Sequence, residues 1–251
     1  MNERIIEFIA PKHYVELKHE YPKPVKLNIP EWYKKLEHSV ADFTAKGCMP
    51  FLDALSYGYV LSIPTDISIK HNVEIVDKDT GKKLRDSQYQ CPIKSQPPLN
   101  INTRDPNAPQ PFHPTSQLAG SPLIEKNKHL PFYKIHNPWI IKTPPGFSCL
   151  FVPPLNNGDD RFEILSGIVD TDSYYKEINF PLVINGDKYP HLDTVIKKGT
   201  PYVQVIPFRR ESWKMKISPQ TTEKYHANSL MYPLRLLYSY KLDYWRKKKC
   251  N

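Results

Sequence analysis

The stretch "YKIHNPWIIKTPPGFSCLFVPPL", Tyr133 to Leu155, carries the clearest fold signal in this chain of 251 residues. Two apolar runs, one around Ile140 and one at Phe147–Val152, flank a Pro-Pro-Gly corner at 144–146. Short apolar runs separated by proline and glycine are typical of strands joined by tight turns. The stretch therefore predicts strand, turn and strand, with Cys149 as a buried thiol.

Further runs of the same kind lie on both sides of this stretch. Those that follow it predict strands at 162–172, 178–184 and 201–208, separated by turn residues. We expect residues 140–210 to form one compact antiparallel β unit. Most of its core is expected to come from Ile141, Phe147, Leu150, Ile168, Val183, Val203, Val205 and Ile206.

The composition also favours β structure. The chain has 26 prolines, 9 glycines and 16 tyrosines, which favours many short strands and stiff loops over long helices. The predicted fold is mainly β: a barrel-like or sandwich-like antiparallel domain with a few short helices. The predicted helices are 30–43, with Trp32, Leu36 and Val40 on one face, and a C-terminal helix within 229–249.

Four parts are predicted along the chain. Residues 1–90 form an N-terminal β-rich part with a short helix, and residues 91–131 a proline-rich connection. Residues 132–217 hold the β unit, and residues 218–251 the C-terminal helix and a basic tail. We expect the four parts to fold together as one compact domain.

The charge balance bears on partners. Lysine and arginine number 35 against 26 acidic residues, a formal net charge of +9, which favours polyanionic partners. The basic C-terminal tail with Arg246–Lys249 is a candidate contact for nucleic acid or nucleotides, as are the "KK" and "RR" pairs with Trp213, Tyr238 and Trp245 nearby, through charge and stacking. A solvated helix face with long basic side chains is the alternative.

Other features bear on compartment. The cysteines are far apart and form no CxxC pair, which disfavours a zinc ribbon. The chain shows no signal peptide, so a reducing, cytosolic context is expected. No apolar run approaches the length of a membrane span, so no membrane association is expected.

Three stretches, taken in order, resemble motifs of the dUTPase family. They are "TPPGFSCLFVPPL" (143–155), "SGIVDTDSYYKEINFPLVI" (166–184) and "IKKGTPYVQVIPF" (196–208). The matching positions are Gly146, Gly167, Asp170, Gly199 and Gln204. This resemblance covers 140–210 and implies a β-clip, the barrel-like all-β fold that dUTPases share with dCTP deaminases.

The dUTPase resemblance also implies roles for residues. Asp170 would be the general base that activates water, and Tyr174 would close over the nucleotide. A carboxylate beside an aromatic wall can orient water against a phosphate, so these roles are chemically sensible. Gly167, Arg161 and Gln204 would contact the nucleotide, and Mg²⁺ would be the cofactor.

The sequence departs from the dUTPase motifs at important points. Ser173 occupies the position of the family's tyrosine, one place before Tyr174. The Arg-Ser pair that holds phosphate is replaced by a stretch in which Arg161 follows two aspartates, and like charge disfavours phosphate. The family's glycine-rich arm with its arginine is also missing. A triphosphate needs several converging donors, so these departures weigh against catalysis.

A structural role is the alternative for the same aspartates. Asp170 and Asp172 can cap a tight turn through Asx hydrogen bonds, and Tyr174 or Tyr175 can pack over it. This interpretation is favoured over the catalytic one.

A second resemblance spans most of the chain. The stretches "KGCMPFLDALSYGY" (46–59), "NPWIIKTPPGFSCLFVPP" (137–154), "VDTDSYYKEINFP" (169–181) and "KGTPYVQVIPFRRESWK" (198–214) are similar to an uncharacterised family of tailed-phage proteins, especially of cyanobacterial phages. The similarity implies a viral source and no known activity.

The motif "HLD", His191 to Asp193, raises a third reading. It has the spacing of two ligands of a 2-His-1-carboxylate iron site, with His226 as a distant third ligand in a cupin-like fold. Its place in a loop next to proline weakens this reading.

Three functions therefore stay open. The leading hypothesis is a non-catalytic, phage-encoded binding or structural protein that takes protein partners and needs no metal or cofactor. It would act in the host cytoplasm and be incorporated in the virion. A nucleotide-handling enzyme of the dUTPase and dCTP deaminase type is second, and an iron oxygenase is third.

Overall fold

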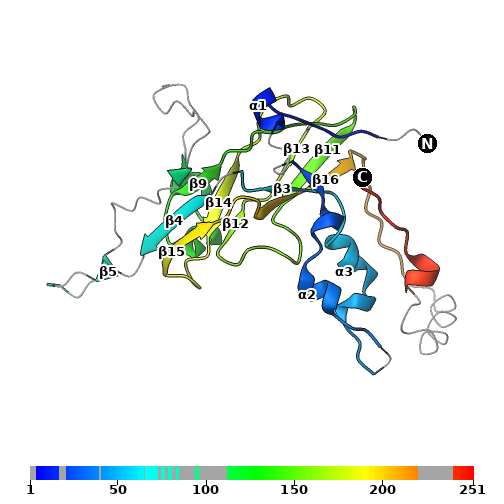
Figure 1. Cartoon of the computed structure of the whole chain (residues 1–251), viewed down its shortest axis with the longest axis horizontal. Helices are drawn as coiled ribbons and strands as arrows, with labels where there is room; N and C mark the ends of the chain where they lie inside the picture. The colour runs from blue at the N-terminus through cyan, green and yellow to red at the C-terminus, as the bar shows by residue number, and fades with distance from the viewer. Residues whose placement is uncertain are drawn as a thin grey trace.

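A computed structural model gives the structure of the protein (Figure 1). It describes residues 4–16, 21–39, 41–64, 66–72, 75–76, 79–80, 83–84, 94–95, 112–219 and 240–251. The described chain is mainly β, its strands pair antiparallel, and its helices are few and short, which confirms the predicted fold class. Each sheet of described strands keeps two end strands, so none of these sheets closes into a barrel.

The largest sheet has five strands in the order β13-β11-β16-β3-β2. Their bounds are Gly167–Val169, Phe147–Val152, Pro201–Arg209, Tyr59–Ser62 and Lys23–Pro24. The two longest, β11 and β16, pair over six residues, from Phe147 opposite Arg209 to Val152 opposite Gln204. This pairing brings the Pro-Pro-Gly corner next to the chain that leaves β16.

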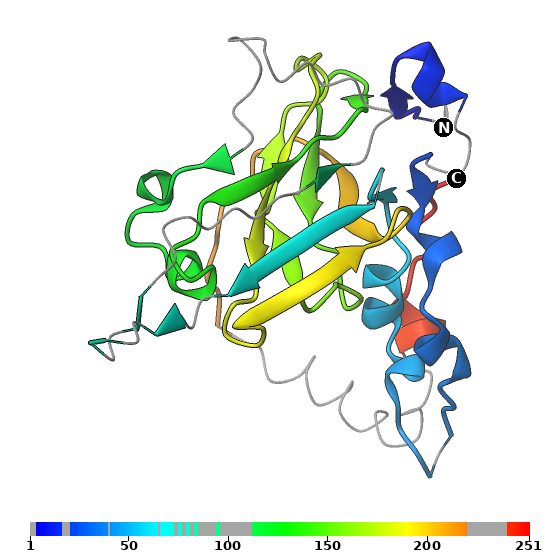
Figure 2. The same cartoon turned by 60° about the vertical axis from the view of Figure 1, so that its left-hand side comes forward.

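Four shorter sheets make up the rest of the β structure in the described residues. A four-stranded sheet has the order β12-β14-β9-β8 and a three-stranded sheet the order β15-β4-β7; β1 pairs with β10 and β5 with β6. Their bounds, sheet by sheet, are Phe162–Ile164, Phe180–Ile184, Phe132–Ile135 and Phe112–His113; His191–Ile196, Ile67–Asn72 and Lys94–Ser95; Glu7–Ile9 and Ile140–Lys142; and Ile75–Val76 and Lys83–Leu84. In Figure 2 the cyan β4 and the yellow β15 run side by side.

The helical elements assigned in the described residues are single turns or little more. They are α1 Lys12–Val15, η2 Val25–Asn28, α2 Glu31–Lys35, η3 Ala45–Gly47, α3 Met49–Ala54, η4 Thr115–Leu118, α4 Pro122–Lys126 and the π-helical turn η5 Tyr240–Tyr244. Most of the predicted C-terminal helix, 220–239, lies outside the described residues. Beyond η5 no helix is assigned up to residue 251.

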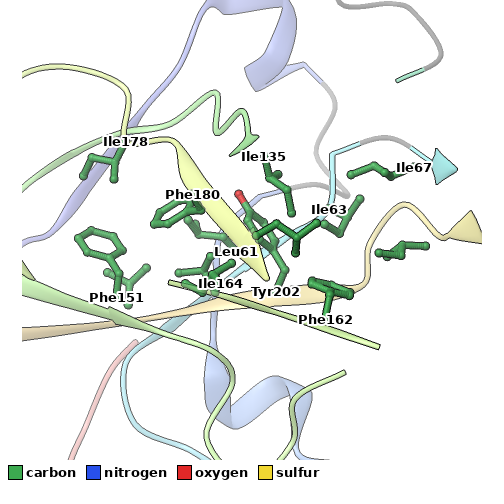
Figure 3. Packing of buried hydrophobic residues seen from close by; sticks show 14 of the residues in the cluster. Leu61, Ile63, Ile67, Ile135, Phe151, Phe162, Ile164, Ile178, Phe180 and Tyr202 are labelled. Atoms are coloured by element: carbon green, nitrogen blue, oxygen red, sulfur yellow. The ribbon is translucent and has the colours of Figure 1, made fainter. Parts of the chain in front are cut away.

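The hydrophobic core is formed by residues of the five-stranded, four-stranded and three-stranded sheets (Figure 3). Phe151 of β11 packs against Phe180 of β14, with ring centroids 5.4 Å apart, and Phe180 meets Tyr202 of β16 edge-on at 5.8 Å. Leu61 of β3 is buried in the same cluster. The N-terminal part and the region 132–217 therefore share one core. Aromatic pairs of this kind add to the free energy of burial.

The predicted core list is half right. Ile141, Val183, Val203 and Val205 are fully buried, whereas Phe147, Leu150 and Ile206 are half-buried and Ile168 is 64% exposed. Successive residues of a strand face opposite sides, and β11 turns Cys149 and Phe151 inward. Leu150 pairs with Ile168 and Ile206 on the outer face of the sheet, so the expectation that they are core residues is wrong.

Several predicted boundaries also change. The strand predicted at 162–172 is two strands in different sheets, β12 and β13, because the chain crosses between the sheets at 165–166. The strands of 140–210 also need β3, β4 and β9 as partners, so this region is not a self-contained unit. The helix predicted at 30–43 ends at Lys35, and it buries Tyr33 while Trp32 is 48% exposed.

Candidate functional site

The site predicted around Asp170 lies at one end of the five-stranded sheet. Because Cys149 pairs with Val169 and Ser148 with Phe208, this register places Ser148, Asp170 and the residues after β16 at the same end. Gly146 has a φ of +83°, a conformation that glycine adopts without strain. The resulting corner directs its backbone N–H at the turn that follows β13.

Asp172 is the most firmly held residue of the site. Its Oδ2 accepts a hydrogen bond of 2.8 Å from the Gly146 N–H, and Arg210 binds both carboxylate oxygens, with Nη1 2.9 Å from Oδ1. Its side chain is only 9% exposed. The Arg210 guanidinium first, and then the Gly146 N–H, lower the pKa of Asp172 from 3.8 to about 2.

Asp170 lies beside this pair but is far more open. Its Oδ1 accepts a hydrogen bond of 2.7 Å from the Ser148 hydroxyl and one of 3.3 Å from Arg210 Nη1. The Asp170 side chain is 62% exposed and the Arg210 side chain 40%. Arg210 also donates to the Ser148 hydroxyl and to the Phe147 carbonyl, so one guanidinium ties together the corner, the turn and β11.

The turn after Asp170 is closed by backbone groups. The Asp170 carbonyl accepts from the N–H groups of Ser173 and Tyr174, at 3.1 and 2.9 Å. The predicted Asx caps are therefore wrong: the aspartate side chains reach across to β11, the corner and Arg210. Tyr174 is 43% exposed, and the Tyr175 hydroxyl donates to the Asp172 carbonyl at 2.8 Å.

A buried hydroxyl and thiol lie beneath the turn. The hydroxyls of Thr143 and Thr171 are 2.7 Å apart, and Thr171 donates to the Cys149 sulfur at 3.4 Å. Burial raises the pKa of Cys149 to about 11, against a smaller lowering by the Thr171 hydroxyl. Cys149 is thus the buried thiol that the sequence predicted, and it is protonated at neutral pH and unsuited to nucleophilic attack.

The structure separates Gln204 from Asp170. Gln204 pairs with Val152, four residues from Ser148 along β11, a separation of about 13 Å at roughly 3.3 Å per residue. Its side chain is 1% exposed and bonded at both ends. Its Oε1 accepts from the Leu155 N–H at 2.8 Å, and its Nε2 donates to the carbonyls of Ala54 and Tyr57.

Arg161 and Gly167 also contact other parts of the fold. The Arg161 guanidinium binds the Asp159 carboxylate, with Nε–Oδ1 2.9 Å and Nη2–Oδ2 2.6 Å, and donates to the Thr194 hydroxyl. Asp159 raises the pKa of Arg161. Gly167 begins β13 opposite Phe151. The Arg161 cation is therefore already paired, which leaves it poorly placed to bind a phosphate.

The "HLD" motif forms part of a strand, so the loop predicted for it is wrong. His191 and Asp193 lie on the exposed face of β15, opposite Asn72 and Lys70 of β4. His226 lies outside the described residues. Within the described part of the chain, no three histidine, cysteine or acidic side chains gather as a metal site would require.

The basic C-terminal segment packs against α3. Lys248 binds Asp53 at 2.6 Å, and the Trp245 indole N–H donates to the same carboxylate at 3.0 Å. The Gly58 N–H contacts the Cys250 sulfur at 3.3 Å. Figure 2 shows this red segment beside α2 and α3.

Two surface hollows lie away from Asp170. A hollow of about 500 Å³ is lined by residues of 115–125 and by His129. A more apolar hollow of about 360 Å³ lies where α3 and β16 meet, and its lining residues are Asp53, Ala54, Tyr57, Leu155, Gln204, Ile206 and Lys248. Neither lining includes a residue of the Asp170 cluster.

Arg210 is the residue of this site that the sequence analysis missed as a partner of the aspartates. The dipeptide Arg209–Arg210 is visible in the sequence, but nothing local shows which of the two turns toward Asp172. The pairing of β11 with β16 was the usable signal, because it brings the end of β16 to the Pro-Pro-Gly corner.

Comparison with protein-family models and with curated proteins finds no match to this chain. In the described part of the chain, no helix has both the length and the apolar character needed to cross a bilayer.

The depressed pKa of Asp172 predicts a loss of stability in acid. A folded-state pKa of about 2, below the unfolded value of 3.8, gives a stabilisation that is complete above pH 4 and is lost as the pH falls toward 2. Asp172→Asn removes that charge at every pH. The urea midpoint of wild type should therefore exceed that of Asp172→Asn at pH 7, and the gap should close between pH 4 and 2.

The matched control for Asp172 is Asp187→Asn, which removes an exposed carboxylate paired with Lys128. Asp187 is 64% exposed, so solvent screens its ion pair and the variant should lie close to wild type. A gap between wild type and Asp172→Asn that stays constant down to pH 2 would contradict the assigned role of Asp172.

Proposed function

We propose that this chain is a non-catalytic binding or structural protein of a tailed phage, made in the host cytoplasm and incorporated in the virion. The observation that carries the non-catalytic part is the bonding of the residues at dUTPase-like positions. Gln204 and Arg161 use their polar groups to hold the chain's own backbone and side chains. Groups already satisfied within the fold have little capacity left for a nucleotide.

The exposed apolar side chains support a protein partner. Trp213 and Ile217 are 88% and 86% exposed, and Phe43 is 58% exposed. Side chains of this size expose apolar surface to water in the free chain. Covering that surface with a partner is favourable and stabilises the complex. The phage assignment rests on the resemblance of four stretches of sequence to a tailed-phage family.

Purified phage particles provide the test of the proposed role. The chain should be found by quantitative mass spectrometry in particles banded by density gradient, at a fixed ratio to the major capsid protein. It should remain after a high-salt wash that strips adventitious proteins. Abundant chain in the infected-cell lysate with none in the particles would contradict incorporation in the virion.

A nucleotide-handling enzyme is the second candidate, and one observation favours it. Asp170 is 62% exposed beside the half-exposed Arg210, an arrangement that leaves a carboxylate open to solvent next to a cation. With Mg²⁺ bound by a triphosphate, such a carboxylate could orient water.

Asp170→Asn separates the two candidates. Asparagine keeps the shape and can still accept from the Ser148 hydroxyl, so the variant should fold with a urea midpoint near that of wild type. Wild type should release no pyrophosphate from dUTP or dCTP with Mg²⁺. Pyrophosphate release by wild type that falls by about 10²-fold or more in Asp170→Asn would establish the enzyme instead.

Nucleic acid is a second partner class that the basic tail supports. Lys248 is engaged with Asp53, but the neighbouring cations of Arg246–Lys249 remain exposed. Binding of single-stranded DNA that weakens steeply with salt, and is lost when Arg246, Lys247 and Lys249 are replaced by serine, would support this partner.

A further inference from the structure

The chain that leaves β16 is an unusual surface feature. Every residue from 209 to 219 is exposed, and no helix or strand is assigned in 210–219. In Figure 1 this orange stretch leaves the end of β16 as a plain coil. Residues 211–218, "ESWKMKIS", are called the docking arm below.

The docking arm has the pattern of a strand with one apolar face. Trp213, Met215 and Ile217 alternate with Lys214 and Lys216. In extended chain, alternate side chains share a face, so the three apolar side chains lie together and the lysines lie opposite. The three are 88%, 85% and 86% exposed, so the part of the chain that the structure describes covers almost none of this face.

A second apolar surface lies close to the root of the arm. Ile168 of β13 is 64% exposed. Tyr174 and Tyr175, in the chain that follows β13 and Asp170, are 43% and 57% exposed. These three residues are called the acceptor patch. β13 is an end strand of its sheet in the described chain, so it can accept another strand beside it.

The arm and the patch are joined at the Asp170 site. Arg210, the residue before the arm, lies 3.3 Å from Asp170, and Asp170 directly follows β13. In a two-fold symmetric pair, the contact of one copy's arm with the other's patch is matched by the reverse contact. Because arm and patch are adjacent in each copy, both contacts can fall in one continuous interface. Eight extended residues also reach roughly 26 Å, enough to cross to a neighbour.

The area that the arm can bury favours a reciprocal exchange. Trp213, Met215 and Ile217 together offer about 400 Å² of apolar surface. One arm on one partner would bury about 800 Å² in total, which is the size of a crystal contact. Two arms exchanged between two copies would bury about 1,600 Å², the size of a standard specific interface.

We propose that two copies of this chain dimerise by exchanging docking arms, each laying its Trp213–Met215–Ile217 face on the acceptor patch of the other. The arm adds to the edge of β13 as an extra strand, and its lysines face solvent. The proposal deepens the binding role proposed above, on which it rests, by naming one partner of the chain.

Sedimentation equilibrium of the full chain tests the dimer. Wild type should show twice the 29.3 kDa chain mass at micromolar concentrations. The triple variant Trp213→Ala, Met215→Ala, Ile217→Ala should weaken dimerisation about 100-fold or more. The matched control, Lys214→Ala with Lys216→Ala, changes the opposite face and should leave the dimer intact. All five side chains are exposed, so both variants should fold.

A complementation experiment tests the exchange itself. Ile168→Asp should break the acceptor patch and yield a monomer. A mixture of this variant with the arm triple variant retains one intact arm and one intact patch, so heterodimers should form, more weakly than the wild-type dimer. Because one exchanged arm buries only about 800 Å², the mixture is compared with each variant alone at up to about 500 µM. A mixture that associates no more than either variant alone, with the wild-type dimer intact, would contradict reciprocal exchange.

Salt distinguishes the dimer from binding through charge. Two copies of net charge +9 repel each other, so raising NaCl from about 50 to about 300 mM should preserve or tighten the dimer. Wild type that stays a monomer up to about 100 µM, or a dimer that the arm triple variant leaves unchanged, would overturn the proposal. A monomer that is nevertheless found in purified particles would overturn the dimer alone and leave the proposed binding role standing.

Discussion

Phe151→Ala should lower the free energy of unfolding by about 3–5 kcal/mol, the usual cost of truncating a buried phenylalanine. Phe151 is 1% exposed and lies between the two main sheets, with its ring centroid 5.4 Å from that of Phe180. The truncation removes this contact and leaves a cavity that the facing strands cannot fill without moving. Urea denaturation with a global two-state fit measures the change.

The neighbouring residue provides the control for Phe151. Leu150→Ala, one position earlier on the same strand, truncates a half-buried side chain on the outer face and should cost less than about 2 kcal/mol. Strand propensity and loop context are nearly the same for the two variants. Equal losses for the two, or a larger loss for Leu150→Ala, would mean that the inward face of β11 is assigned wrongly.

Gln204→Leu should lower the free energy of unfolding by roughly 2–4 kcal/mol, although leucine fills a similar volume with an apolar side chain. The amide satisfies the N–H of Leu155 and the carbonyls of Ala54 and Tyr57. Leucine leaves all three backbone groups without this partner at a partly buried position. The loss should appear in the denaturant midpoint with little change in its slope.

Two variants sharpen the Gln204 experiment. Gln204→Glu keeps the acceptor for Leu155 but cannot donate when ionised, and burial raises the pKa of a carboxyl. This variant should therefore recover stability as the pH falls from 7 to 5. Gln117→Leu changes an exposed glutamine and should lie within about 0.5 kcal/mol of wild type. A Gln204→Leu midpoint equal to that of wild type would contradict the structural role of Gln204.

A catalytic and a structural role of the dUTPase-like motifs make different demands on the tertiary fold. The sequence places Asp170, Gly167 and Gln204 in the order of a dUTPase, but order along the chain does not set distances. The register of β11 with β16 puts Gln204 about 13 Å from the Asp170 end, and loop residues pair with Arg161. Only the pairing of the strands reveals that Gln204 is far from Asp170.

Local structure could be predicted from the amino-acid sequence alone. Apolar runs and turn residues located β10, β11, β14 and β16, because a strand needs only a suitable run of side chains and a break at each end. The corner before Phe147 was also visible, since Gly146 supplies the φ of +83° that the turn adopts.

The buried face of each strand and the pairing of charges depend instead on how the strands pack in three dimensions. In "FSCLFV" both faces carry apolar side chains, so the sequence cannot say whether Leu150 or Phe151 points inward; the sheet that packs on β11 decides it. Likewise Arg209 and Arg210 are indistinguishable in the sequence. The pairing of β16 with β11 brings Arg210 to Asp172, because contacts between distant residues depend on strand register and not on local sequence.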